Sequence, residues 1–126
     1  MQSLLNTSLS ALGAFGVGMQ VTADNIANVN TPYFKSGRAY YETGPQGYGT
    51  RVGELSRDIS PGPAIPALPP DTIDMSPAAA ALREGSNVSL EREFTQMISL
   101  EHAYSANAMV VRTVDDIAGV VLDMKV

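Results

Sequence analysis

The C-terminal third of the chain restricts its fold more than any other segment. Residues 86–126 contain no proline and a single glycine. Apolar or small side chains recur there in a 4-3 alternation, which is typical of a helix that presents one stripe to a partner helix. The positions are Leu90, Phe94, Met97, Tyr104, Ala108, Val111, Ala118 and Leu122, interrupted by Glu101 and Asp115. The pattern predicts a helix over residues 87–124, about 50 Å long, whose stripe must be covered by another helix.

A second helix is predicted over residues 3–28, where Leu5, Leu9, Leu12, Gly16, Met19, Ala23 and Ile26 follow the same alternation. The matching stripes favour pairing of the two terminal helices as an antiparallel coiled coil. Three glycines, Gly13, Gly16 and Gly18, interrupt the N-terminal helix, and each costs roughly 1 kcal/mol relative to alanine. They indicate either flexibility or a close approach of another helix, and both interpretations stay open.

The segment DNIANVNTP, residues 24–32, follows the N-terminal helix. Asn25, Asn28 and Asn30 crowd a helix end, where asparagine tolerates left-handed backbone and bonds to nearby peptide groups. Pro32 disfavours helical backbone at the residue before it. A helix cap and exit turn explain much of this composition, but amides at three such close positions could also bond to a neighbouring subunit.

Between the helices, the pattern changes to short strands and then to proline. Residues 33–59 predict a β-hairpin region with a loose connection at residues 42–49. Residues 60–85 are rich in proline and predict an extended segment, in which residues 60–77 should have no strand ladder of their own. We therefore expect one domain over residues 1–126, mainly α with a small β-rich insertion.

The long helix carries a second file of apolar side chains at Val110, Val114, Ile117, Val121 and Met124. One partner helix cannot cover both files, and the chain has few other elements to do so. A broad core-facing surface is one explanation. We favour packing between subunits, because a head-to-tail contact of that kind propagates into rings or filaments.

Composition excludes several function classes. The net charge of −5 argues against a nucleic-acid partner, and the absence of cysteine excludes disulfides and thiolate metal sites. His102 is the only histidine, and nothing in the sequence marks a catalytic partner for it. We expect no enzyme activity, no cofactor or metal, and no small-molecule substrate. The first 23 residues carry no charged side chain, so the basic region of a cleavable signal peptide is missing.

The residues at both ends resemble the bacterial flagellar rod and hook axial proteins. Residues 3–36 are similar to the family's N-terminal signature, above all in DNIANVNTP. Residues 86–122 are similar to its C-terminal signature, notably in the SNV, EF, MI and AYSAN motifs. Residues 50–63 also look like the segment that follows the family's hairpin. Two features depart from the pattern: Tyr33 stands where glycine is usual, and only about fifty residues separate the helices. The small size is most like a proximal rod protein.

The resemblance implies a structural subunit of the basal-body rod, exported by the flagellar type III apparatus without a cleaved signal. Such subunits self-associate, with other axial subunits, into a helical tube across the periplasm that transmits torque. The implied assembly residues are Leu5, Leu12, Met19, Asn25, Ile26, Asn28, Asn30, Phe94, Met97, Tyr104, Asn107, Val111, Val114 and Val121. The alternatives are a secreted accessory or capping factor, or a shortened hook or distal-rod paralogue, that binds the rod without being a main subunit.

Overall fold

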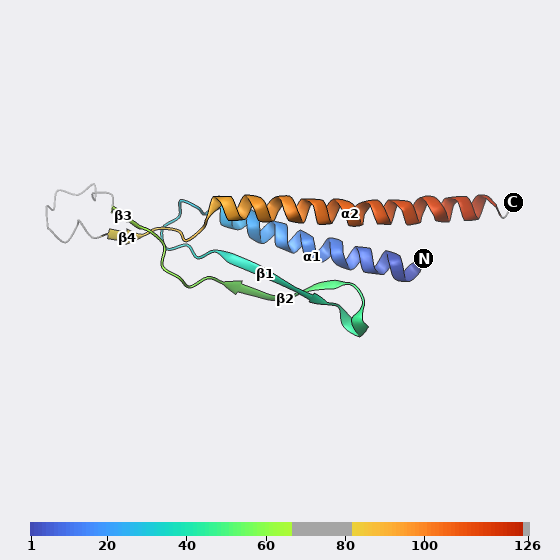
Figure 1. The fold of residues 1–126 in the computed structure, drawn as a ribbon, viewed down its shortest axis with the longest axis horizontal. Coiled ribbons are helices and arrows are strands. Elements are labelled where there is room, and N and C mark those ends of the chain that lie inside the picture. Colours follow the sequence, from blue (N-terminus) through green and yellow to red (C-terminus); the bar gives the residue numbers. More distant parts are fainter. Residues whose placement is uncertain (67–81, 125–126) are drawn as a thin grey trace.

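The computed structural model describes residues 1–66 and 82–124 of the chain. Two long helices, α1 (Gln2–Ala27) and α2 (Leu90–Asp123), run antiparallel along an elongated molecule (Figure 1). The start of α1 and the end of α2 therefore lie at the same end (Figure 1). Both predicted helices and their antiparallel arrangement are confirmed, with bounds that differ by a few residues. Supercoiling of the pair as a coiled coil stays a prediction.

The buried face of α1 consists of small or polar side chains: Ser8, Ala11, Ala14, Gly18, Thr22 and Asn25. The prediction that a large apolar stripe faces the partner helix is therefore wrong for this chain. Leu9 is 54% exposed, and Leu5, Leu12, Met19 and Ile26 are half-buried. The physical reason is that α1 lies between α2 and the hairpin (Figure 1). Small side chains let its backbone approach both neighbours, which a bulky stripe would hold apart.

The packing face of α2 is likewise rotated from the predicted stripe, by about one residue. Glu93, Leu100 and Val114 are its buried residues, and they are separated by multiples of seven. The half-buried Asn107 fills the missing step of this series. Phe94 and Tyr104, from the predicted stripe, are exposed instead. The predicted seven-residue spacing is therefore correct, but the prediction of which side chains occupy the packing face is wrong.

Strands β1 (Gly37–Thr43) and β2 (Thr50–Arg57) form the predicted antiparallel hairpin. Tyr40 pairs with Glu54 and Tyr41 with Val52, so the register shifts by one residue at a bulge. The connection includes a short 3₁₀ turn, η1 (Pro45–Gly47). The hairpin packs on α1 through an edge-to-face contact between Phe15 and Tyr41, whose ring centroids are 5.6 Å apart.

The proline-rich segment forms a small ladder at its two ends. Strand β3 (Ala64–Pro66) pairs antiparallel with β4 (Leu82–Glu84). The prediction that residues 60–77 have no ladder is therefore wrong at Ala64–Pro66. The pairing is short because Pro66 lacks an amide donor to continue it. The predicted extended conformation of residues 67–81 lies outside the described residues.

Among the three glycines of α1, Gly18 is the one whose lack of a side chain the packing requires. A Cβ built there would overlap the Tyr41 hydroxyl and lie 3.1 Å from a Leu100 methyl group. Nothing lies within 4 Å of a Cβ at Gly13 or Gly16. Close approach is therefore the explanation for Gly18, whereas the other two glycines have open space in the single chain.

We expect Gly18→Ala to lower the free energy of unfolding by about 1–3 kcal/mol, because Tyr41 and Leu100 must move. Gly13→Ala is the matched control and should raise it by up to about 1 kcal/mol through helix propensity. Urea denaturation followed by circular dichroism measures both. Equal effects of the two substitutions would contradict the close-packing explanation.

Tyr33 occupies strained backbone in the connection from α1 to β1. Its φ is 63°, in the left-handed region that costs a non-glycine residue roughly 1–2 kcal/mol. Its amide donates to the Glu84 carbonyl at 3.0 Å, which holds the connection against β4. The side chain is mostly exposed, so packing of the ring contributes little stability to offset the strained backbone.

Tyr33→Gly should therefore stabilise the chain by about 0.5–1 kcal/mol, because relief of strain exceeds the greater unfolded-state entropy of glycine. Tyr33→Ala keeps the strained φ without the ring and should not stabilise. Thermal denaturation of the two variants separates a backbone effect from a side-chain effect. An equal gain in both would show that the ring, rather than the backbone, is responsible.

Candidate assembly surface and the junction that holds it

Asn25 joins α1 to the start of β1. Its side-chain amide donates to the Gly37 carbonyl at 2.9 Å, and its side-chain oxygen accepts from the Gly37 amide at 2.7 Å. The residue is only 1% exposed. Asn25 therefore forms two hydrogen bonds with the amide and carbonyl of one residue, as a neighbouring strand would. It belongs to the interior of the chain rather than to its outer surface.

Glu93 brings α2 into the same junction. One carboxylate oxygen accepts from Asn25 Nδ2 at 3.0 Å, and the other accepts from Arg38 Nη2 at 3.1 Å. Glu93 is 1% exposed, and a buried carboxylate costs several kcal/mol unless it is paired and hydrogen-bonded. Its partners come from α1 and β1. The carboxylate thus fixes the positions of three elements relative to one another.

A second polar cluster connects the segment before α2 to the ends of the hairpin. Asn87 accepts from the Ser36 amide at 2.7 Å and donates to the carbonyls of Asp58 and Ser60 at 2.9 and 3.0 Å. Asn87 therefore does not cap α2. The N-cap is Ser89, whose hydroxyl bonds to the Glu91 carboxylate and not to a helix amide.

Glu84 anchors β4 to this cluster. It forms an ion pair with Lys35 and accepts from the Gly62 amide at 2.7 Å. The hydrogen bond from Lys35, followed by that from Gly62, lowers the pKa of the Glu84 carboxyl below its ordinary value. The fold is stabilised while this carboxyl is charged, and that contribution is lost as the pH falls through its lowered pKa.

The remaining asparagines of the exit segment divide between a cap and the surface. Asn28 donates to the Asp24 carbonyl and accepts from the Thr31 hydroxyl, so it closes the end of α1. Asn30 is exposed. The cap-and-turn interpretation is correct for Asn28, while a role of Asn28 or Asn30 in binding another subunit stays a prediction.

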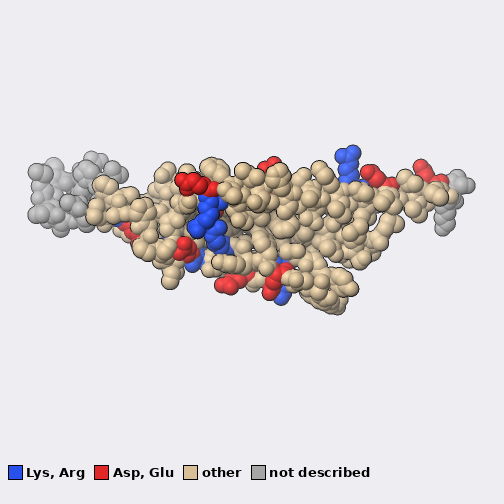
Figure 2. Space-filling view, viewed as in Figure 1, with Lys and Arg blue, Asp and Glu red and all other residues tan. Residues whose placement is uncertain are grey.

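The outer surface of the helix pair carries most of the large apolar side chains. The exposed ones on the helices are Leu4, Leu9, Leu90, Phe94, Ile98, Tyr104, Met109, Ile117, Val120, Val121 and Leu122, with Met124 at the end of α2. We call this set the apolar helix surface. In Figure 2 most of the visible surface along the helices is uncharged. Apolar surface of this extent typically marks a site of protein–protein contact.

The predicted assembly residues divide between this surface and the interior. Phe94, Tyr104 and Val121 are exposed, and Val114 is buried against α1. Half-buried positions are Leu5, Leu12, Met19, Ile26, Met97, Asn107 and Val111. Sequence analysis missed Glu93 and Arg38 as junction residues. The signal that could have found Glu93 is its seven-residue spacing to Leu100.

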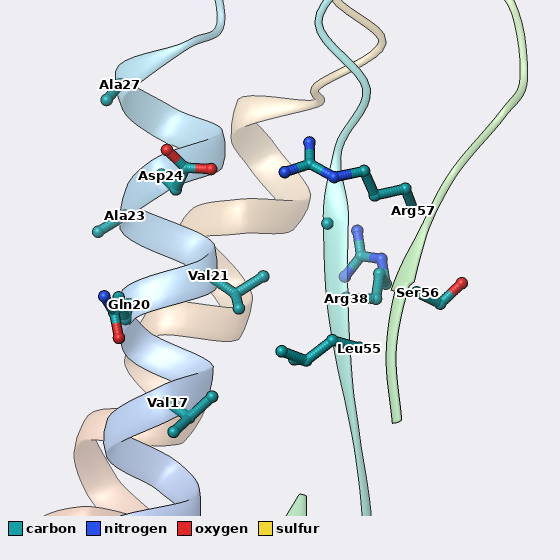
Figure 3. A pocket seen from close by; sticks show the side chains of 11 residues that line it. Val17, Gln20, Val21, Ala23, Asp24, Ala27, Arg38, Leu55, Ser56 and Arg57 are labelled. Carbon is teal, nitrogen blue, oxygen red and sulfur yellow. The ribbon is translucent and has the colours of Figure 1, made fainter. Parts of the chain in front are cut away.

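Several grooves border the helices, and two of them matter for assembly. The larger, about 720 Å³, lies between α1 and the hairpin (Figure 3). Val17, Val21 and Leu55 give it apolar walls, and Arg38 and Arg57 extend from the strand side (Figure 3). A second groove of about 600 Å³ lies where the start of α1 meets α2, between Met1, Leu5, Val111 and Ala118.

The described residues contain no group of three or more His, Asp or Glu side chains that could hold a metal ion. None of their helices is long and apolar enough to span a bilayer.

The junction yields a test of stability. Asn25→Ala should lower the free energy of unfolding by about 3–5 kcal/mol, because it leaves the Glu93 carboxylate and the Gly37 peptide groups without partners. Asn30→Ala, an exposed asparagine in the same segment, should change it by no more than about 0.5 kcal/mol. Chemical denaturation gives both values. Near-equal losses of unfolding free energy in the two variants would show that the hydrogen bonds of Asn25 do not stabilise the fold.

Comparison with known proteins gives two family matches, one that includes Asn25 and one that includes Glu93. A family model described as flagella basal body rod protein matches residues 5–35. One described as flagellar basal body rod FlgEFG protein C-terminal matches residues 79–124. The two matches cover 31 and 46 residues, together 77 of the 126. No curated protein sequence matches the chain. Because the two matches together cover more than half of the chain, the chain belongs to the flagellar basal-body rod and hook axial protein family.

Proposed function

We propose that this protein is a main subunit of the basal-body rod and that it self-assembles through its terminal helices. The family gives it a structural role in the flagellar basal body. The observation that carries the more specific proposal is the apolar helix surface. Its large side chains remain exposed although both helices are fully formed, so they are available to other subunits.

The internal contacts support a separation between residues that stabilise the fold and residues that contact other subunits. Asn25, Glu93 and Arg38 hold the elements together with polar bonds, and small side chains line the contact between α1 and its neighbours. Few large apolar side chains are buried within the folded chain in the part that the structure describes. We therefore assign Asn25 and Val114 to the fold of the subunit, and Phe94, Tyr104 and Val121 to contacts between subunits.

Other axial subunits and the type III export apparatus are the partners that this role requires. The rod would form in the periplasm after export without a cleaved signal. The alternative, a secreted accessory or capping factor, or a shortened hook or distal-rod paralogue, would use the same surface without becoming a main component. Copy number separates the two, because a main subunit is present in several fixed copies per basal body.

Tyr104→Ala tests the assembly role. Tyr104 is 39% exposed, so its loss should leave the fold intact while it removes an aromatic contact of the kind that dominates interfaces. We expect export to continue and incorporation into basal bodies to fall at least about tenfold, with loss of swimming. Asn28→Ala should have the same effect on incorporation.

His102→Ala is the matched control, because His102 is exposed on α2 two residues from Tyr104. It should swim normally. Swimming assays, immunoblots of exported protein and purified basal bodies give the readouts. Normal swimming of both Tyr104→Ala and Asn28→Ala would rule out the assigned contacts. Intact basal bodies after deletion of the gene would favour the accessory or paralogue alternative.

A further inference from the structure

The last turns of α2 extend past the start of α1 (Figure 1). Ala118 is the last residue of α2 that borders the groove beside the start of α1. Figure 1 shows the helix continuing beyond that point without a neighbour among the described residues. We call residues 116–124 the overhang. Its exposed apolar side chains are Ile117, Val120, Val121, Leu122 and Met124.

The overhang is also acidic. Asp116 and Asp123 lie seven residues apart, so both fall on one side of the helix, with Val120 between them. The overhang contains these two aspartates and no lysine or arginine, and Lys125 follows it. A partner for this segment therefore needs an apolar groove with positive charge at its edge.

The groove between α1 and the hairpin has apolar walls and charged side chains at its edges, with Arg38 and Arg57 on the strand side and Asp24 on α1. Val17, Val21 and Leu55 line it, and the Leu55 side chain is 60% exposed. Figure 3 shows the guanidinium groups of Arg38 and Arg57 at its strand side. Arg38 is paired with Glu93. Within the described residues, Arg57 has no carboxylate partner, and it donates only to the Lys35 carbonyl at 3.1 Å while lying over the Phe34 ring.

We propose that the overhang of one copy docks in the α1–hairpin groove of a second copy of this chain. The exposed apolar side chains of the overhang would fill the groove, and its aspartates would face Arg57. This inference rests on the proposed function, and it deepens that function by naming the two mating surfaces. Charge complementarity and the exposed apolar area on both sides carry it.

The position of the two surfaces determines what such a contact builds. The overhang lies at one end of the long axis, and the groove borders the end of α1 far from it (Figure 1). Because the surfaces are different and separate, each copy can donate one overhang and receive another. A head-to-tail contact of this kind extends into a filament unless its rotation closes a ring. In Figure 2 the visible basic side chains gather mainly in a band toward the end where α2 begins.

A mixing experiment tests the pairing directly. Leu55→Glu disables the groove and leaves the overhang intact, whereas Val121→Glu does the reverse. Both side chains are more than half exposed, so the folds should survive, which circular dichroism checks. Ile59→Glu is the control, because Ile59 is 88% exposed and borders neither surface. Sedimentation velocity at concentrations up to about 1 mM gives the mass of each species.

We expect the wild type and Ile59→Glu to associate as concentration rises, and each single variant to remain at the monomer mass of 13.3 kDa. An equimolar mixture of the two variants should form a species of twice that mass and nothing larger, because only one productive overhang–groove pair is left. A mixture that stays monomeric, a variant that associates like the wild type, or a wild type that remains monomeric overturns the inference.

Swimming assays keep this result distinct from the proposed function. If Leu55→Glu and Val121→Glu strains swim normally while Tyr104→Ala does not, the docking contact is wrong and the rod role stands. If deletion of the gene leaves basal bodies intact, the proposed function itself fails, whatever the solution behaviour of the variants.

Discussion

The fold depends on one buried carboxylate. Glu93 contacts Asn25 and Arg38, and through them it joins α2 to α1 and β1. Among the described residues, the buried apolar side chains are few: Ala11, Ala14, Leu100 and Val114. A core of that size contributes limited hydrophobic stabilisation. Polar contacts must therefore fix the arrangement, and a buried ion pair does so through directional bonds even where its net contribution to stability is small.

The same arrangement leaves the large apolar side chains on the outside. Small residues such as Ala11 and Gly18 line the packing face of α1, while Leu9 and Phe94 face outward. The division reverses the usual expectation that the bulkiest side chains fill the core. It is consistent with a subunit whose apolar area is buried mainly by other copies. Binding to the folded state raises its stability by mass action, so the fold and the assembly would be stabilised together.

Sequence patterns were sufficient for the elements but not for the faces they bury. Periodicity located both helices and the hairpin because helix and strand spacings are local properties. It assigned the packing face to Leu9 and Phe94 because hydrophobicity cannot distinguish a contact within the chain from one between chains. Glu93 lies in the first turn of α2, where a carboxylate also suits the helix dipole. Its pairing with Asn25, 68 residues away, is a tertiary contact that no local rule predicts. The β3–β4 ladder was missed for the same reason.

The glycines show how one residue type serves two purposes along α1. Gly18 lies against Tyr41 and Leu100, so the packing of a single chain explains it. Gly13 and Gly16 have no neighbour within reach of a Cβ, although each weakens the helix by about 1 kcal/mol. No packing contact within the subunit compensates for this loss of helix stability, whereas a contact with another subunit could do so. Their open space lies on a helix whose large apolar side chains also lack partners, and a backbone approached closely by another subunit would account for both.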